Sequence, residues 1–158
     1  MAARDIAFIA AILFVSALVF FSFNFIMNTA YDEISQVPEV NESDNSMEVF
    51  QTLETTANRL DYVFLGVFIA LLLSLIISSY FVGGHPIFMF VYFIVVVIVV
   101  VISPVLSNVW ETATQNASFG LTVASMPITN HILLLLPYYM VAIAFIGIVT
   151  MFASALRE

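Results

Sequence analysis

Two histidines and a group of acidic residues are the side chains of this sequence that could take part in chemistry. His85 lies in the turn-like sequence Gly83-Gly84-His85-Pro86, and His131 stands at the start of the last apolar segment. A histidine acts as a general base or a metal ligand only beside suitable partners. The apolar segments that separate these two place them at opposite faces of a membrane, where they cannot meet. Cysteine is absent, which excludes disulfides and thiol chemistry. We therefore expect no catalytic residue, no metal site, no cofactor and no enzymatic activity.

The acidic residues concentrate in one polar segment, residues 28–61. Eight acids and one base give this segment a net charge of −7. A calcium-binding loop needs a D-x-[DN]-x-[DN]-G pattern, which residues 32–44 do not contain. The cluster thus favours a solvated acidic surface over a metal site. The acids are Asp32, Glu33, Glu39, Glu42, Asp44, Glu48, Glu54 and Asp61, and the base is Arg59.

The overall charge narrows the classes of partner. The chain carries a net charge of −8, has no lysine, and has Arg4, Arg59 and Arg157 as its basic residues. Binding to nucleic acid or to anionic lipid headgroups depends on clusters of lysine and arginine. We therefore expect no direct contact with nucleic acid, and we expect the lipid bilayer and other proteins as partners.

Long uncharged segments identify the solvent of most of the chain as lipid. Of the 158 residues, 63% are hydrophobic and 9% are charged, whereas soluble domains carry about 25% charged residues. A helix needs about 20 apolar residues to cross a membrane. Backbone groups in lipid must pair internally, and these segments lack the alternation of barrel strands. We predict an all-α polytopic protein with a single membrane domain, residues 1–158, whose spans are about 6–27, 62–82, 87–103 and 131–155.

Polar loops are expected at residues 28–61 and 104–130. Residues 31–45 should be irregular. An amphipathic helix should follow, with Ser46 as its N-cap, because apolar residues recur at intervals of three or four. These residues are Met47, Phe50, Leu53, Ala57 and Leu60.

The second half of the chain contains several local signals. Pro86 can open a helix directly after a tight turn, so the second and third spans should form an antiparallel hairpin. Ser103-Pro104 should bend or end the third span, and Pro137 should kink the fourth. Thr129 or Asn130 is expected to cap the fourth span. Trp110, Tyr62 and Tyr80 are expected as aromatic anchors at the membrane interface.

The same pattern sets an orientation and a contact surface. The first span should be a retained signal anchor, and an even number of spans places both termini on one side. Arg4 and Arg157 outnumber Arg59, so the positive-inside rule puts the termini on the cytoplasmic side. Partner contacts are expected on the first polar loop, at Asp32, Glu33, Glu42, Asp44, Phe50 and Leu53.

The interiors of the spans argue against active transport. Ion and proton pathways usually contain acidic, basic or histidine side chains within the membrane, and the interiors of these spans contain none, since His131 stands at the edge of the fourth span. An anchoring or organising protein is the favoured interpretation. An oligomeric pore former such as a holin, or an accessory subunit of a cellular membrane complex, remains the alternative.

Three short stretches carry a family resemblance. They are Tyr80-Phe81-Val82-Gly83-Gly84-His85-Pro86, Leu106-Ser107-Asn108-Val109-Trp110-Glu111 and Met126-Pro127-Ile128-Thr129-Asn130. These stretches resemble small hydrophobic proteins of tailless icosahedral bacteriophages with an internal lipid membrane, of the corticovirus-like and Flavobacterium lipid-phage type. The resemblance implies a multi-copy structural protein of the virion's internal membrane, or of the host cytoplasmic membrane before assembly, whose loops touch the capsid or the genome. The negative charge favours the capsid.

Overall fold

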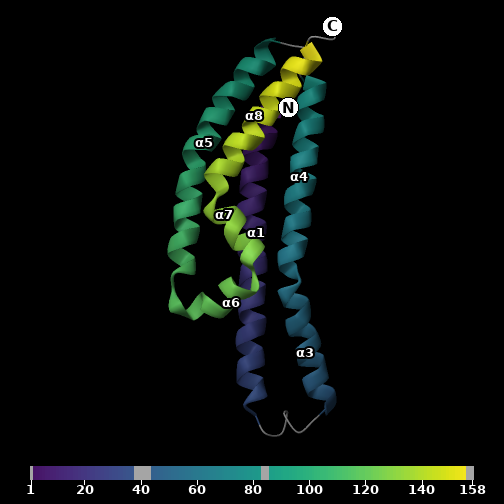
Figure 1. Cartoon of the computed structure of the whole chain (residues 1–158), viewed down its shortest axis with the longest axis vertical. Coiled ribbons are helices and arrows are strands. Elements are labelled where there is room, and N and C mark those ends of the chain that lie inside the picture. The colour runs from purple at the N-terminus through teal and green to yellow at the C-terminus, as the bar shows by residue number, and fades with distance from the viewer. Residues whose placement is uncertain (1, 38–43, 83–85, 156–158) are drawn as a thin grey trace.

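The computed structural model describes residues 2–37, 44–82 and 86–155, and every regular element in these ranges is helical. The expected all-α class is confirmed. The elements, coloured along the chain in Figure 1, are α1 (Ala2–Ser35), α3 (Asp44–Asn58), α4 (Leu60–Val82), α5 (Pro86–Thr114), η1 (Ala117–Phe119), α6 (Gly120–Ser125), α7 (Pro127–Leu134) and α8 (Leu136–Ala155).

The described residues include four helical stretches that are long and apolar enough to cross a membrane. They are Phe8–Ser35, Glu48–Phe81, Met89–Thr114 and Leu136–Ala153. No more than a third of the residues in the most apolar window of each stretch are buried within the protein. Most side chains of the spans therefore face outward, as in an integral membrane protein whose outer surface meets lipid.

The spans α1, α4, α5 and α8 form a bundle in which the consecutive spans α4 and α5 are not neighbours in space. Both α1 and α8 pack against α4 and against α5, so α4 and α5 occupy opposite corners. These two helices run in opposite directions, as expected of a hairpin (Figure 1). The expectation that they pack together is wrong, because α1 and α8 separate them. The start of α1 and the end of α8 lie at the same end of the bundle.

The first and third spans are longer than expected. Helix α1 has 34 residues, about 51 Å at 1.5 Å per residue, whereas a hydrocarbon core is about 30 Å thick. Asp32 and Glu33, expected in a loop, lie in its last turns. Helix α5 likewise passes through Ser103 and Pro104 and ends at Thr114. Of the two outcomes expected at Ser103-Pro104, an end of the helix is wrong, and a bend stays a prediction.

A hydroxyl group explains why Pro104 does not end α5. Proline lacks the N–H that would donate to the carbonyl four residues earlier, at Val100. The Ser103 hydroxyl donates to this Val100 carbonyl at 3.3 Å. Serine side chains commonly satisfy carbonyls freed by proline in membrane helices.

Pro137 acts differently and confirms the predicted kink. The helical path breaks at Leu135, between α7 and α8. The carbonyl of Leu134 at this break accepts a hydrogen bond from the Ser107 hydroxyl of α5 at 2.7 Å. The break thus connects the fourth span to the third.

A tyrosine from α5 crosses the bundle at a glycine of α8. A Cβ added at Gly147 would collide with the hydroxyl of Tyr92, and this hydroxyl donates to the Ala144 carbonyl at 3.3 Å. The same Cβ position lies 3.4 Å from the Ser79 hydroxyl oxygen of α4. Glycine is therefore required here because α4, α5 and α8 converge at its Cα.

We expect Gly147→Ala to destabilise the bundle, because the added methyl group overlaps the Tyr92 hydroxyl. Overpacking of this kind costs about 1–3 kcal/mol. The measurement is thermal unfolding in detergent micelles, followed by circular dichroism. Gly66→Ala is the matched control, since a Cβ at Gly66 meets nothing within 4 Å. Removing the hydroxyl with Tyr92→Phe should recover part of the loss in the double variant, and an additive double variant would contradict this explanation.

Candidate functional site

The carboxylate of Asp61 binds the beginning of another helix. Asp61 lies in the first turn of α4 and is 2% exposed. Its Oδ2 accepts from the backbone N–H of Ile128 at 2.9 Å. Its Oδ1 accepts from the backbone N–H and the hydroxyl of Thr129, both at 2.7 Å. Asp61 therefore caps α7 from across the fold and places a negative charge at the positive end of that helix.

The cap differs from the one expected from the sequence. Neither Thr129 nor Asn130 precedes the helix, because α7 begins at Pro127, and Met126 before it makes no side-chain cap. Thr129 donates to Asp61, and Asn130 Oδ1 accepts from Trp110 Nε1 at 3.0 Å. Asp61, counted among solvated acids, is buried. The one sequence signal for this role is an acid directly at the start of an apolar span.

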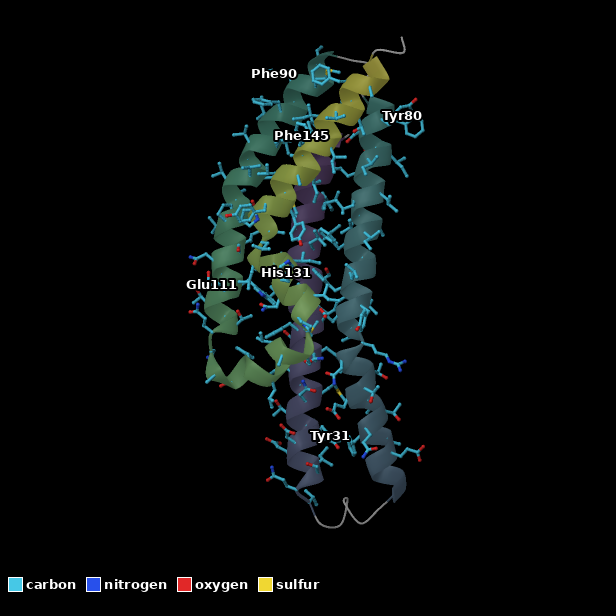
Figure 2. All side chains as sticks on the ribbon, viewed as in Figure 1. Tyr31, Tyr80, Phe90, Glu111, His131 and Phe145 are labelled. Atoms are coloured by element: carbon cyan, nitrogen blue, oxygen red, sulfur yellow. The ribbon has the colours of Figure 1, made fainter. Side chains whose placement is uncertain are left out.

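The aromatic residues expected at the membrane interface fall into two groups. Trp110 is 1% exposed and packs edge to face on Phe21, with ring centroids 5.0 Å apart. Trp110 thus lies inside the protein, where its indole N–H donates to Asn130. The expectation that it anchors the protein at the membrane surface is wrong. Tyr62 and Tyr80 are 69% and 41% exposed, and Figure 2 shows Tyr80 pointing outward from α4. Their role as anchors stays a prediction.

Asn24 is a second point at which polar groups join distant helices. Its side chain on α1 is fully buried. Its Nδ2 donates to Asn58 Oδ1 of α3 at 3.2 Å. Its Oδ1 accepts from Asn28 Nδ2 at 2.8 Å and from the Ser125 hydroxyl of α6 at 2.9 Å. The Asn24 amide thus forms three of the four hydrogen bonds that it can form, and they join α1, α3 and α6.

We call the polar side chains that form hydrogen bonds around Asp61, Asn24 and Trp110 the polar layer. It lies where the bundle ends, at the level of α6 in Figure 1. Its members share burial or partial burial and hydrogen bonds between different helices. They are Asn24, Asn58, Asp61, Trp110, Ser125, Thr129 and Asn130.

Residues 104–130 are mostly helical and not the loop that was expected. After α5 ends at Thr114, η1 and α6 lead into α7. Asn116 Oδ1 accepts from the Ser118 N–H at 3.1 Å and so caps η1. Phe119 packs edge to face on Phe21 and Phe25 of α1, at centroid distances of 5.4 and 4.8 Å. This connection is held against α1 by aromatic contacts.

Beyond the polar layer, residues 28–35 of α1 and helix α3 run side by side and project past α6 (Figure 1). We call this pair the stalk. The predicted amphipathic helix is confirmed as α3, but it begins at Asp44, so Ser46 lies inside it and is not its N-cap. The irregular segment expected at 31–45 is helical at 31–35 and at 44–45, and residues 38–43 lie outside the described ranges.

The residues expected to contact partners lie on this stalk where they are described. Asp32 and Glu33 are exposed on α1, Leu53 is exposed on α3, and Phe50 is partly buried. Asp44 is the first residue of α3. Glu42 lies outside the described residues. The surface that brings these candidates together is therefore formed by two helices and not by a loop.

The described residues offer no clear site for catalysis or metal binding. Among them, no group of three or more histidine, cysteine or acidic side chains could hold a metal ion. His131 is exposed on α7, with its ring centroid 6.5 Å from that of Tyr139. Figure 2 shows His131 near the middle of the molecule and Glu111 pointing outward from α5. His85 lies outside the described residues.

We expect Asp61→Ala to destabilise the protein strongly. The change leaves the N–H groups of Ile128 and Thr129 buried without an acceptor, at a cost of about 3 kcal/mol from lost charge-assisted hydrogen bonds and a lost cap. Unfolding can be followed in micelles by the fluorescence of Trp110, the single tryptophan. The exposed Asp32→Ala serves as the control. Equal midpoints for the two variants would refute a structural role of the Asp61 cap.

We expect Asn24→Ala to loosen α3 while the bundle stays folded, because α3 loses its hydrogen bond to α1. Amide hydrogen exchange of α3, measured by mass spectrometry, should accelerate about tenfold. Asn108→Ala, at an exposed position of α5, is the matched control. Unchanged exchange in α3 would show that other contacts hold it.

The polar layer and the stalk are thus the candidate functional site. Their geometry is that of a structural junction that presents an acidic surface. Comparison of the chain with protein-family models, with curated proteins and with solved structures finds no match.

Proposed function

We propose that this chain is a non-enzymatic structural membrane protein, in which the bundle is the anchor and the stalk is the contact surface. The observation that carries the proposal is the set of hydrogen bonds around Asn24, which join α1, α3 and α6 where the bundle ends. These bonds hold the stalk in a defined position relative to the spans. A defined projection suits a protein that links a bilayer to another layer.

The continuity of α1 supports the same proposal. Helix α1 runs from the bundle into the stalk without a break. The second connection, between α3 and α4, is interrupted at Arg59, but Asn58 on the α3 side is bonded to Asn24. Force applied to the stalk is therefore transmitted to the bundle through a helix and a buried hydrogen bond.

The packing of the bundle disfavours the alternative of a pore within one chain. Its interior is filled by apolar side chains such as Leu13, Phe64 and Leu75. Among the residues described, Asp61 is the single buried ionisable residue of the acidic and basic types, and it is bonded to α7. A pore of the holin type would have to form between several chains.

The finer proposal rests on the resemblance to membrane proteins of lipid-containing tailless bacteriophages. We propose that many copies reside in the internal membrane of a virion, or in the host cytoplasmic membrane before assembly. The acidic stalk then faces capsid proteins and not the genome, because phosphates repel its charge. The excess of Arg4 and Arg157 over Arg59 supports termini on the cytoplasmic side.

Site-specific photo-crosslinking tests the proposal. A photoreactive amino acid at Leu53, exposed on the stalk, should give crosslinks to a capsid protein in purified virions. The same group at Phe93, exposed on the outer face of α5, should crosslink to lipid and serves as the control. The chain should also stay with the membrane after alkaline extraction.

Three outcomes would contradict the proposal. Crosslinks from Leu53 to cellular membrane proteins would favour an accessory subunit of a cellular complex. Collapse of the membrane potential on expression of the chain alone would favour a pore former. Absence of the chain from lipid-containing virions would remove the viral assignment.

A further inference from the structure

A small hollow opens where the stalk meets α6. It has a volume of about 190 Å³. Helix α1 contributes Asn28, Tyr31 and Asp32, α3 contributes Glu54 and Asn58, and α6 contributes Leu121 and Ser125. Figure 2 labels Tyr31 on the stalk, below the level of α6. The hollow therefore continues outward from the Asn24 hydrogen bonds to the stalk surface.

Two carboxylates from different helices, those of Asp32 and Glu54, line the hollow, and an ionised carboxylate only accepts hydrogen bonds. Among the described residues, the carboxylates of Asp32 and Glu54 and the Tyr31 hydroxyl have no hydrogen-bond or ion-pair partner. The amide of Asn28 donates to Asn24, and this leaves its own oxygen free to accept. Acceptors from two helices thus face one space and lack a positively charged donor.

The described residues do not place a positively charged side chain in the hollow. Arg59 is the one basic residue of segment 28–61. It lines a different, shallow hollow on α3 together with Glu48 and Thr52. The segment therefore keeps its net charge of −7, and a partner that brings positive charge is electrostatically favoured over a second copy of the chain.

Size and ligand number restrict the occupant further. Pockets for drug-sized molecules measure about 300–1,000 Å³, so this hollow is smaller than such a pocket. Calcium takes six to eight oxygen ligands, and the described chain has no group of three ionisable ligands. An arginine side chain fits better, because its planar guanidinium donates five N–H groups and pairs well with carboxylates.

We propose that this hollow receives an arginine from a basic segment of a partner protein. The guanidinium lies between Asp32 and Glu54, and its aliphatic part lies against the ring of Tyr31. The inference rests on the proposed function, since it names the chemistry of the protein that the stalk contacts. It assigns the recognition to the junction of α1, α3 and α6 and not to the acidic surface as a whole.

Peptide binding to the full-length chain in zwitterionic lipid nanodiscs tests the proposal. The probe is a fluorescein-labelled hexapeptide of alternating serine and arginine, measured by fluorescence anisotropy. The variant Asp32→Asn with Glu54→Gln should weaken binding about tenfold, because two charge-assisted contacts are lost. The control, Glu33→Gln with Glu48→Gln, removes the same charge from the same helices outside the hollow, and its affinity should change less than about twofold.

A charge-reversed variant provides the second measurement. Asp32→Lys with Glu54→Lys should lose the arginine peptide and gain binding of a matched serine–glutamate peptide. Trp110 fluorescence reports whether each variant keeps its fold. Equal weakening by the two neutralised variants would show diffuse attraction to the acidic surface and overturn the inference.

Other outcomes also overturn it. The first is that the unmodified chain does not bind the arginine peptide. The second is that calcium displaces the peptide by binding in the hollow itself. The third is that the chain associates with itself in a way that depends on Asp32 and Glu54. The proposed function is tested separately by the Leu53 crosslinks. Virion crosslinks without peptide binding would refute only the proposal that the hollow receives an arginine. Peptide binding without virion crosslinks would refute only the proposed contact with the capsid.

Discussion

The fold depends on the hydrogen bonds that stabilise one buried carboxylate, that of Asp61. An ionised side chain removed from water must be paired or hydrogen-bonded, and the contacts that the Asp61 carboxylate makes within the described residues are to Ile128 and Thr129. The first N–H groups of α7 serve this purpose. They are free to do so because Pro127 occupies the first helical position and Met126 provides no cap. A carboxylate without a cation and a helix without its own cap thus satisfy each other.

That contact determines what neighbouring residues can reach. Six residues of the chain, from Ser125 to Asn130, carry contacts to α1, α4 and α5. Ser125 binds Asn24, Thr129 binds Asp61, and Asn130 binds Trp110. A displacement of this six-residue segment by one helical turn would break all of these hydrogen bonds together. The base of the bundle is therefore specified by polar contacts, whereas its interior is specified by apolar packing.

The sequence predicts the local features of this protein well and the long-range ones poorly. The four spans can be predicted from the lengths of the apolar segments, and α3 from the spacing of Phe50, Leu53 and Ala57. Both signals come from residues that are close together in the sequence. Asp61 and Thr129 are 68 residues apart, and Asn24 and Ser125 are 101 apart. No local pattern reports such pairs. The two prolines show the same limit, since Pro104 is accommodated by its neighbour Ser103, but the break near Pro137 is bonded to Ser107 of another helix.

The unbroken course of α1 fixes the distance between its two ends. A helix of 34 residues extends about 51 Å, and a hydrocarbon core takes up about 30 Å of that length. Roughly 20 Å is left outside the core, and it does not shorten, because helices bend gently and do not compress. In the function proposed above, a layer that rests on the tip of α1 would be kept at a set height above the lipid. Tilting of this one helix would change that height, and membrane thickness would thereby be converted into a gap between two surfaces.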